Sequence, residues 1–299
     1  MKRILITGAH SYIGTNVENY LYTYNSTEGR EIYRTDTLSQ REEGWENVDF
    51  APYDAVFHVT GIAHADTGSV TDEEKALYYR INCDLALQTA EKAKREGVKQ
   101  FIYMSSIIVY GDSAPLGETK QITPDTKPSP SNFYGDSKWQ AEQRLRPLED
   151  EDFHVAILRP PLIYGRGSKG NYPLLVRLAE KLPVFPDIPN QRSMLYIGNL
   201  CEFVRLLIES GQGGTYFPQN ETYVTTSQMV KSIAAVRGKN IRLWKVLNPL
   251  VKLLSRFPGK PGRFVNKAFG SLTYEFGMSE SFQGYRIYDL EESLRRDAG

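Results

Sequence analysis

The sequence predicts an α/β fold with a doubly wound parallel sheet and a smaller mixed α/β domain after it. Short apolar runs alternate with helical patterns up to about residue 165, which is typical of parallel βαβ units. The first apolar run ends in glycine and leads directly into a helix. A glycine-rich stretch follows residue 165, so we place the domains at 1–165 and 166–299, with a segment around 193–223 able to rejoin the first.

Composition excludes several classes of protein. The 299 residues contain 36 Lys and Arg against 36 Asp and Glu, so no basic field favours nucleic acid. Cys83 and Cys201 indicate neither a disulfide scaffold nor a metal site, which suits a reducing cytoplasm. The apolar run at the N-terminus is far too short to span a bilayer. We therefore expect a cytoplasmic globular protein without metal.

The first turn predicts a dinucleotide site. A strand at 2–7 precedes Gly8-Ala9-His10-Ser11-Tyr12-Ile13-Gly14, and a helix follows to about residue 24. Gly8 permits the tight turn, Gly14 permits close packing of helix on strand, and N–H groups at the helix start can hold a pyrophosphate. Ser11 replaces the usual middle glycine, and an ordinary glycine turn is the alternative. The expected cofactor contacts here are Gly8, Ser11, Tyr12, Ile13 and Gly14.

Further cofactor contacts are expected after the second strand. That strand covers 31–36, and Asp36 at its end is placed to bond an adenosine ribose, which favours NAD. Arg34 and Arg41 keep NADP open, because a guanidinium can pair with a 2′-phosphate. Asp49 and Phe50 are candidates to flank the adenine.

The third strand predicts another part of this site. It covers 54–61 and ends in Thr60-Gly61, small residues that suit a cofactor passing over strand ends. His58 lies in its apolar run and is expected in the core, whereas His64 in the following loop could touch substrate. A helix over 73–97 carries Asn82 on its apolar side, where an amide needs a partner.

A tyrosine and a lysine form the candidate catalytic pair. Strand 100–103 ends near Ser105-Ser106, and residues 107–111 are expected to continue it. A proline-rich loop over 115–130 then leads to Tyr134. Tyr134 and Lys138 lie one helical turn apart. A neighbouring ammonium favours the phenolate and lowers the tyrosine pKa, so that Tyr134 could move a proton near neutral pH.

The remaining elements are assigned from their periodicity. The segment 241–257 is amphipathic and basic; it either packs on its own domain or lies on a membrane surface. The other elements are helices at 136–149, 172–181, 199–209 and 227–237 (with Thr225 or Thr226 as N-cap), a strand at 154–158 and a charged helix at 289–296.

These motifs, in this order, resemble the extended short-chain dehydrogenase/reductase family and its nucleotide-sugar epimerase/dehydratase branch. The resemblance implies a Rossmann-type fold. It implies that Tyr134 is the catalytic acid/base and that Lys138 holds the nicotinamide ribose. It further implies that Ser106 bonds the reacting sugar oxygen and that Asn171 and Arg192 hold the substrate's diphosphate. Asn82 also matches a feature of the branch.

The resemblance implies a reaction at C4 of a UDP-hexose or UDP-N-acetylhexosamine through a transient 4-keto sugar. Members that eliminate water carry an Asp-Glu pair where this chain has Ile107 and Ile108, which disfavours a dehydratase. An NADPH-dependent 4-ketoreductase of surface-polysaccharide synthesis is the alternative, and a non-catalytic dinucleotide-binding protein is a third. A homodimer is expected, built through helices 73–97 and 136–149.

Overall fold

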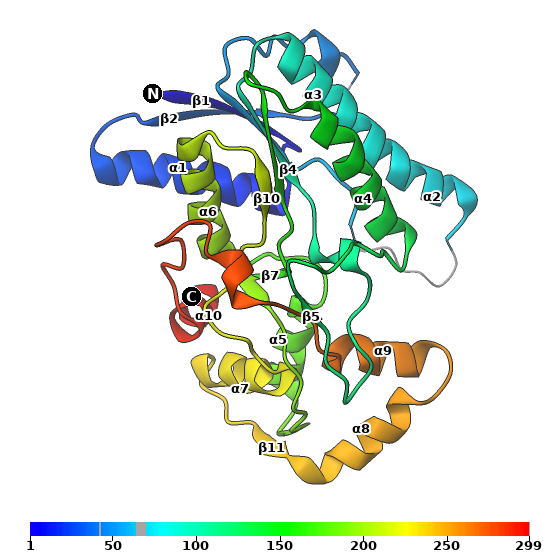
Figure 1. The fold of residues 1–299 in the computed structure, drawn as a ribbon. Coiled ribbons are helices and arrows are strands. Elements are labelled where there is room, and N and C mark those ends of the chain that lie inside the picture. Colours follow the sequence, from blue (N-terminus) through cyan, green and yellow to red (C-terminus); the bar gives the residue numbers. More distant parts are fainter. Residues whose placement is uncertain (42, 64–69, 299) are drawn as a thin grey trace.

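A six-stranded parallel sheet forms the centre of the molecule (Figure 1). The structure is a computed structural model, and it describes residues 1–41, 43–63 and 70–298. The strand order is β2-β1-β3-β4-β6-β10, and every neighbouring pair is parallel. The strands are β1 (Lys2–Thr7), β2 (Tyr33–Leu38), β3 (Ala55–His58), β4 (Gln100–Met104), β6 (His154–Leu158) and β10 (Gly214–Tyr216).

Helices cover both faces of this sheet. Side chains alternate along β1, so that Ile4 and Ile6 point into one core and Leu5 into another. The first core lies under α1 (Tyr12–Glu28) and α6 (Ile197–Ser210). The second lies under α3 (Leu85–Arg95) and α4 (Phe133–Leu145), and α2 (Asp72–Tyr79) packs beside α4 (Figure 1). The predicted fold class is confirmed.

The strand order reverses between β1 and β3, and the two strand ends touch there. Gly8 has a φ of +80°, and a Cβ placed on it would lie 2.9 Å from the backbone nitrogen of Thr60. Only glycine fits this backbone conformation and this approach without strain. In open α/β sheets the point of reversal is where ligands bind.

Two predicted elements around the sheet have a different form. Residues 107–111 do not continue β4; Ile107–Tyr110 form a 3-10 helix, with Ser106 as its N-cap. Its apolar side chains fill a small core, and an apolar run alone cannot distinguish a buried strand from a short buried helix. The predicted helix over 73–97 is α2 and α3 joined by a π-helical segment, Arg80–Asp84.

The second half of the chain builds a mixed region below the sheet (Figure 1). Its helices are α5 (Tyr172–Lys181), α7 (Thr226–Val236), α8 (Asn248–Ser255), α9 (Lys260–Phe269) and α10 (Leu290–Ala298). Its parallel strand pairs are β7 (Leu162–Tyr164) with β9 (Met194–Tyr196), β8 (Val184–Pro186) with β11 (Arg242–Trp244), and β5 (Gln121–Ile122) with β12 (Thr273–Tyr274). Thr225 is the N-cap of α7, one of the two residues predicted for that role.

The segment 241–257 is not one helix. It contains β11, a 3-10 turn and then α8, in which Pro249 occupies the first turn. Proline lacks the N–H that a helix interior needs, so it starts a helix here instead of continuing one. The sequence analysis missed α9, whose start also contains a proline.

The domain boundary near residue 165 stays a prediction, and β10 and α6 from the second half pack with the central sheet. None of the helices in the described residues is long and apolar enough to cross a membrane.

Candidate active site

Tyr134 and Ser106 meet where the first turn of α4 packs on the 3-10 helix after β4. Asn132 caps α4 by accepting a hydrogen bond from the Gly135 N–H at 2.9 Å. A Cβ on Gly135 would lie 2.7 Å from the carbonyl oxygen of Ile108, so glycine permits this contact between the two helices. The Ser106 hydroxyl lies close enough to Tyr134 to lower the pKa of its phenol. The structure therefore brings the predicted hydroxyl pair together.

Lys138 lies one turn further along α4, inside the protein. Its ammonium donates to the Met104 carbonyl at 2.9 Å and lies 4.8 Å from the centre of the Tyr103 ring. A Cβ on Gly61 would lie 3.2 Å from Lys138 Nζ and 3.1 Å from Asn82 Oδ1. Lys138, Asn82 and Gly61 therefore lie side by side, at the end of β3.

Asn82 has the partners that its burial requires. It accepts from the Ile62 N–H at 2.8 Å and donates to the Ile62 carbonyl at 3.0 Å and to Ser137 Oγ at 3.1 Å. It lies in the π-helical segment, and such segments frequently occur at functional sites. Asn82 thus ties the loop after β3 to α4 beside Lys138.

The pKa values in this site differ from the sequence expectation. Burial raises the pKa of Tyr134 to about 12, against a smaller lowering by the nearby Ser106 hydroxyl. Burial lowers the pKa of Lys138 to about 8. The ammonium of Lys138 donates to the Met104 carbonyl, and the effect of Lys138 on the tyrosine pKa stays a prediction. Tyr134 is therefore a protonated phenol at neutral pH and is set up to donate a proton.

A buried ion pair supports this pair of residues from behind. Glu142 on α4 is fully buried and pairs with Arg159 after β6 at 2.5 Å. Ser105 donates to Glu142 at 2.5 Å, and Arg159 donates to the Tyr110 hydroxyl at 2.5 Å. The network joins α4 to the chain on both sides of Ser106. The sequence analysis missed Glu142; its spacing of four residues from Lys138 was the available signal.

The first turn and the end of β3 form a cradle that fits a dinucleotide. Ser11, which replaces the usual middle glycine, is the N-cap of α1 and accepts a hydrogen bond from the Gly14 N–H at 3.1 Å. A Cβ on Gly14 would lie 3.1 Å from Val59 and 3.2 Å from Ile6, so this glycine lets α1 pack on the sheet. The helix N-terminus between Ser11 and Gly14, with Tyr12 and Ile13, suits a pyrophosphate.

The predicted ribose contact, Asp36, does not lie at the end of its strand. β2 runs to Leu38, so Asp36 lies opposite Leu5 inside the strand and pairs with Arg3 at 3.4 Å. Gln40 follows the strand end and accepts from Thr60 Oγ1 at 2.7 Å. The sequence analysis missed Gln40, and the ribose contact of Asp36 stays a prediction.

The remaining predicted residues of the first half differ in their burial. The Phe50 ring is fully buried in the core under α3, so it presents no face to an adenine, and the predicted role of its ring is not supported. Asp49 is exposed. His58 is fully buried and hydrogen-bonds Thr7 Oγ1 at 2.9 Å, which confirms it as a core histidine. His64 lies outside the described residues.

Asn171 and Arg192 line one small pocket, together with Phe264 and Lys267 of α9. The guanidinium of Arg192 donates to the carbonyls of Lys267 at 2.6 Å and Ala268 at 3.3 Å. Burial lowers the pKa of Arg192 to about 10. No acidic side chain pairs with it among the described residues, and such a cation favours an anionic ligand.

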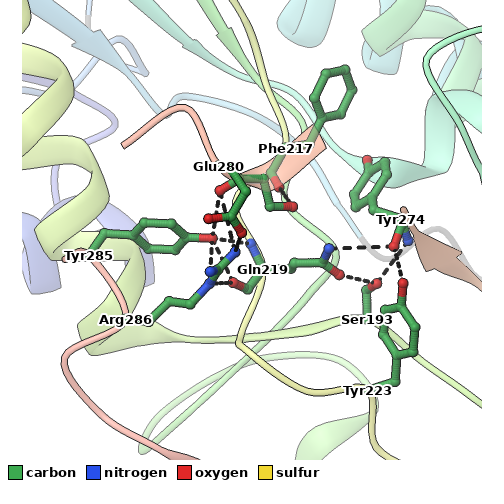
Figure 2. Close-up of polar contacts among 9 residues, drawn as sticks. Ser193, Phe217, Gln219, Tyr223, Tyr274, Glu280, Tyr285 and Arg286 are labelled. Atoms are coloured by element: carbon green, nitrogen blue, oxygen red, sulfur yellow. Dashed lines mark hydrogen bonds and ion pairs between the residues drawn. The ribbon is translucent and has the colours of Figure 1, made fainter. Parts of the chain in front are cut away.

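The backbone beside Arg192 is fixed by a polar network (Figure 2). Ser193 donates to the side chain of Gln219 at 2.5 Å and accepts from the Tyr274 N–H at 2.9 Å. The Gln219 carbonyl accepts from the Tyr285 hydroxyl at 2.7 Å and from Arg286 at 3.1 Å. Two distant segments bond Ser193 directly, and a third holds Gln219 in place, so the position of the neighbouring arginine is held firmly.

The comparison with known proteins agrees with this geometry. A model of the NAD dependent epimerase/dehydratase family matches residues 4–217. The chain is 28% identical to a UDP-glucose 4-epimerase of Vibrio cholerae, over 99% of this chain and 94% of that one. It is 27% identical to the N-acetyl-alpha-D-glucosaminyl-diphospho-ditrans,octacis-undecaprenol 4-epimerase of Escherichia coli O157:H7, over 86% and 81%.

A solved structure shows the same fold. The UDP-N-acetylglucosamine 4-epimerase of Bacillus cereus superimposes with a TM-score of 0.74 at 15% identity, covering 100% of this chain and 98% of that one. The predicted family, the predicted enzyme class and the predicted nicotinamide cofactor are confirmed. The chain belongs to the NAD-dependent epimerase/dehydratase family of extended short-chain dehydrogenases/reductases.

Proposed function

We propose that the protein interconverts the C4 epimers of a UDP-hexose or UDP-N-acetylhexosamine through a transient 4-keto sugar. The observation that carries this proposal is the proximity of the Tyr134 and Ser106 hydroxyls, with Lys138 one helical turn away beside Gly61. A proton donor and a second hydroxyl then face one sugar oxygen, and hydride exchange at that carbon needs this arrangement.

In this proposal each side chain has a separate task. Ser106 holds the C4 oxygen, and Tyr134 exchanges the proton on it. Lys138 holds a cofactor ribose at the end of β3, with Gly61 and Asn82 beside it. NAD held in this cradle would supply a reversible hydride acceptor for C4. Burial raises the pKa of Tyr134 to about 12, which favours the phenol that would protonate the 4-keto oxygen in the returning half-reaction.

The substrate's diphosphate would lie against Arg192 and Asn171. A guanidinium binds phosphate oxygens through two parallel charge-assisted hydrogen bonds. Arg192 has carbonyl partners on one side, and no carboxylate pairs with it among the described residues. Both relatives are named for 4-epimerisation of a sugar, one joined to UDP and one joined through a diphosphate to undecaprenol. A diphosphate is the feature that these two substrates share.

The residues after Ser106 support epimerisation over dehydration. Ile107 is buried and Ile108 is half-buried, and neither side chain can carry a proton. The alternative is an NADPH-dependent 4-ketoreductase of a UDP-4-keto sugar in surface-polysaccharide synthesis. That alternative agrees with Asp36, which pairs with Arg3 inside β2 and does not end the strand. A carboxylate at the strand end would disfavour a 2′-phosphate.

One experiment separates the two reactions. The purified protein is incubated with UDP-hexoses and UDP-N-acetylhexosamines in deuterated water without added reductant, and the products are followed by NMR. An epimerase yields the C4 epimer without deuterium at C4, because the hydride returns from the cofactor. If these sugars do not react while a UDP-4-keto sugar is reduced with equal loss of NADPH, the reductase alternative holds and the epimerase proposal is wrong.

A further inference from the structure

The helices α8 and α9 carry a basic, apolar surface that the reaction does not use. They pack against each other at the end of the molecule furthest from β1 (Figure 1). Seven of the twelve large hydrophobic side chains that are exposed in the described residues lie within residues 244–264. These seven are Trp244, Val246, Leu250, Leu253, Leu254, Phe257 and Phe264.

Packing on the protein's own core does not explain these side chains. Within α8 only Val251 is buried, whereas Leu250 and Leu253 are each 55% exposed. Phe264 on α9 is 54% exposed, while Val265 beside it reaches the core. Each helix therefore packs inward through a narrow stripe and directs a second apolar stripe outward. Exposed apolar clusters of this kind mark interaction sites.

The charge on the same segment is of one sign. Residues 222–274 contain no Asp or Glu, although acidic and basic residues balance over the whole chain. The basic residues in this range are Lys231, Arg237, Lys239, Arg242, Lys245, Lys252, Arg256, Lys260, Arg263 and Lys267. We define the α8–α9 surface as the seven exposed apolar side chains together with the exposed Arg242, Lys245, Lys252, Arg256, Arg263 and Lys267.

We propose that the α8–α9 surface binds the surface of an anionic phospholipid bilayer. Apolar side chains enter the boundary between headgroups and acyl chains, and lysine and arginine around them pair with lipid phosphates. A second copy of this chain is a poorer occupant, because two such surfaces brought face to face repel each other. The charge thus selects a bilayer over self-association.

Docking in this way would bring the diphosphate pocket to the membrane. Phe264 is both an exposed member of the α8–α9 surface and a lining residue of the pocket that contains Arg192 and Asn171. Arg192 also bonds the carbonyl of Lys267 on the same helix. The protein would therefore work with this pocket next to the lipid headgroups. The proposal goes beyond the epimerase function and does not depend on it.

Vesicle binding tests the proposal with the full chain. The protein is sedimented with vesicles of phosphatidylcholine alone or of phosphatidylcholine with phosphatidylglycerol. We expect at least about tenfold stronger partitioning onto the anionic vesicles, because each basic residue near the surface contributes about fivefold. Added salt should reduce the binding. The emission of Trp244, which is 45% exposed, should shift to the blue only with anionic vesicles, and Trp244→Phe should remove the shift.

Matched variants assign the binding to this surface. Leu250→Ser with Leu253→Ser should lower partitioning at least about tenfold, because several buried methylene groups are lost. Tyr22→Ser on α1, where the side chain is 72% exposed, should change nothing. Retained NAD binding shows that each variant is folded. The proposal is overturned if anionic vesicles do not bind, if Tyr22→Ser loses as much, or if the double variant only converts a dimer to a monomer.

Discussion

The Ser106–Tyr134 site and the α8–α9 surface place their charged side chains in opposite surroundings. At the site, Lys138, Glu142 and Arg159 are buried, and each has a defined partner. On the α8–α9 surface the basic side chains are exposed, in a segment without any acidic residue. Burial with partners fixes a geometry, and exposure without partners leaves charge available to another molecule.

The two regions separate residues that stabilise the fold from residues that are available to bind another molecule. A buried ion pair holds position, because removing one partner leaves the other without compensation. An exposed basic residue contributes little to folding and can be changed at low cost. Substitutions that break the buried pairs should therefore lower the free energy of unfolding. Substitutions on the α8–α9 surface should change binding and leave the free energy of unfolding nearly unchanged.

The largest effect is expected from Glu142→Gln. The change leaves the Arg159 guanidinium buried without its carboxylate, and breaking a buried pair of this kind costs about 3–5 kcal/mol. Denaturant unfolding measures the loss. Glu291→Gln, which breaks the exposed pair with Arg295 at 2.5 Å, is the matched control and should cost less than about 1 kcal/mol. Equal losses for the two variants would show that the buried pair stabilises the fold no more than the exposed pair does.

Next is Tyr134→Phe, which should act on turnover and leave folding intact. The variant lacks the hydroxyl that lies beside Ser106, so turnover should fall at least about 100-fold, the scale of a lost general acid/base. NAD binding measured by calorimetry should stay near the wild-type value. Near-normal turnover in the purified variant would remove Tyr134 from the proposed mechanism.

Sequence patterns predicted the sheet because it depends on local signals, and they selected the residues that the structure brings together beside Tyr134. Glycines at a strand end and a Tyr–Lys pair four residues apart are weak signals alone, and their order along the chain made them informative. The Asp36 prediction used the end of a strand, and that end moved from 36 to Leu38. Strand ends depend on pairing with a neighbour, which a single strand's residues do not encode. The burial of the Phe50 ring was not predictable for a related reason, since burial depends on what packs over a side chain.

The mixed region was harder to predict, and α9 was missed. Its start contains Lys260-Pro261-Gly262, which has the composition of a loop. The partner of Glu142 was not predictable either, because Arg159 lies 17 residues away and only the fold brings the two together. Long-range pairs of this kind set the position of Tyr134.

A smaller effect is expected from Gly135→Ala. Its Cβ would lie 2.7 Å from the Ile108 carbonyl oxygen, so α4 must move away from the 3-10 helix that carries Ser106. Overpacking of this kind costs about 1–3 kcal/mol, and turnover should fall together with stability. Gly277→Ala is the control, because a Cβ there meets nothing within 4 Å. Unchanged turnover in Gly135→Ala would show that the spacing of the two helices does not matter.

The smallest effect concerns His58, the buried histidine beneath the cofactor cradle. Burial lowers the pKa of His58 to about 3 from its ordinary 6.5. Between these values the unfolded chain binds a proton that the folded chain does not. The contribution of His58 to the free energy of unfolding is therefore fully present above about pH 6.5 and is lost as the pH falls. The slope from this residue is at most about 1.4 kcal/mol per pH unit.

His58→Gln keeps a hydrogen-bonding group for Thr7 and removes the titration. Denaturant unfolding from about pH 7 to about pH 5 should therefore show a shallower loss in the variant than in the wild type. If the free energy of unfolding fell equally with pH in the variant and the wild type, His58 would take up its proton in the folded protein. The interior under the cradle would then accept a charged group, as the α8–α9 surface does.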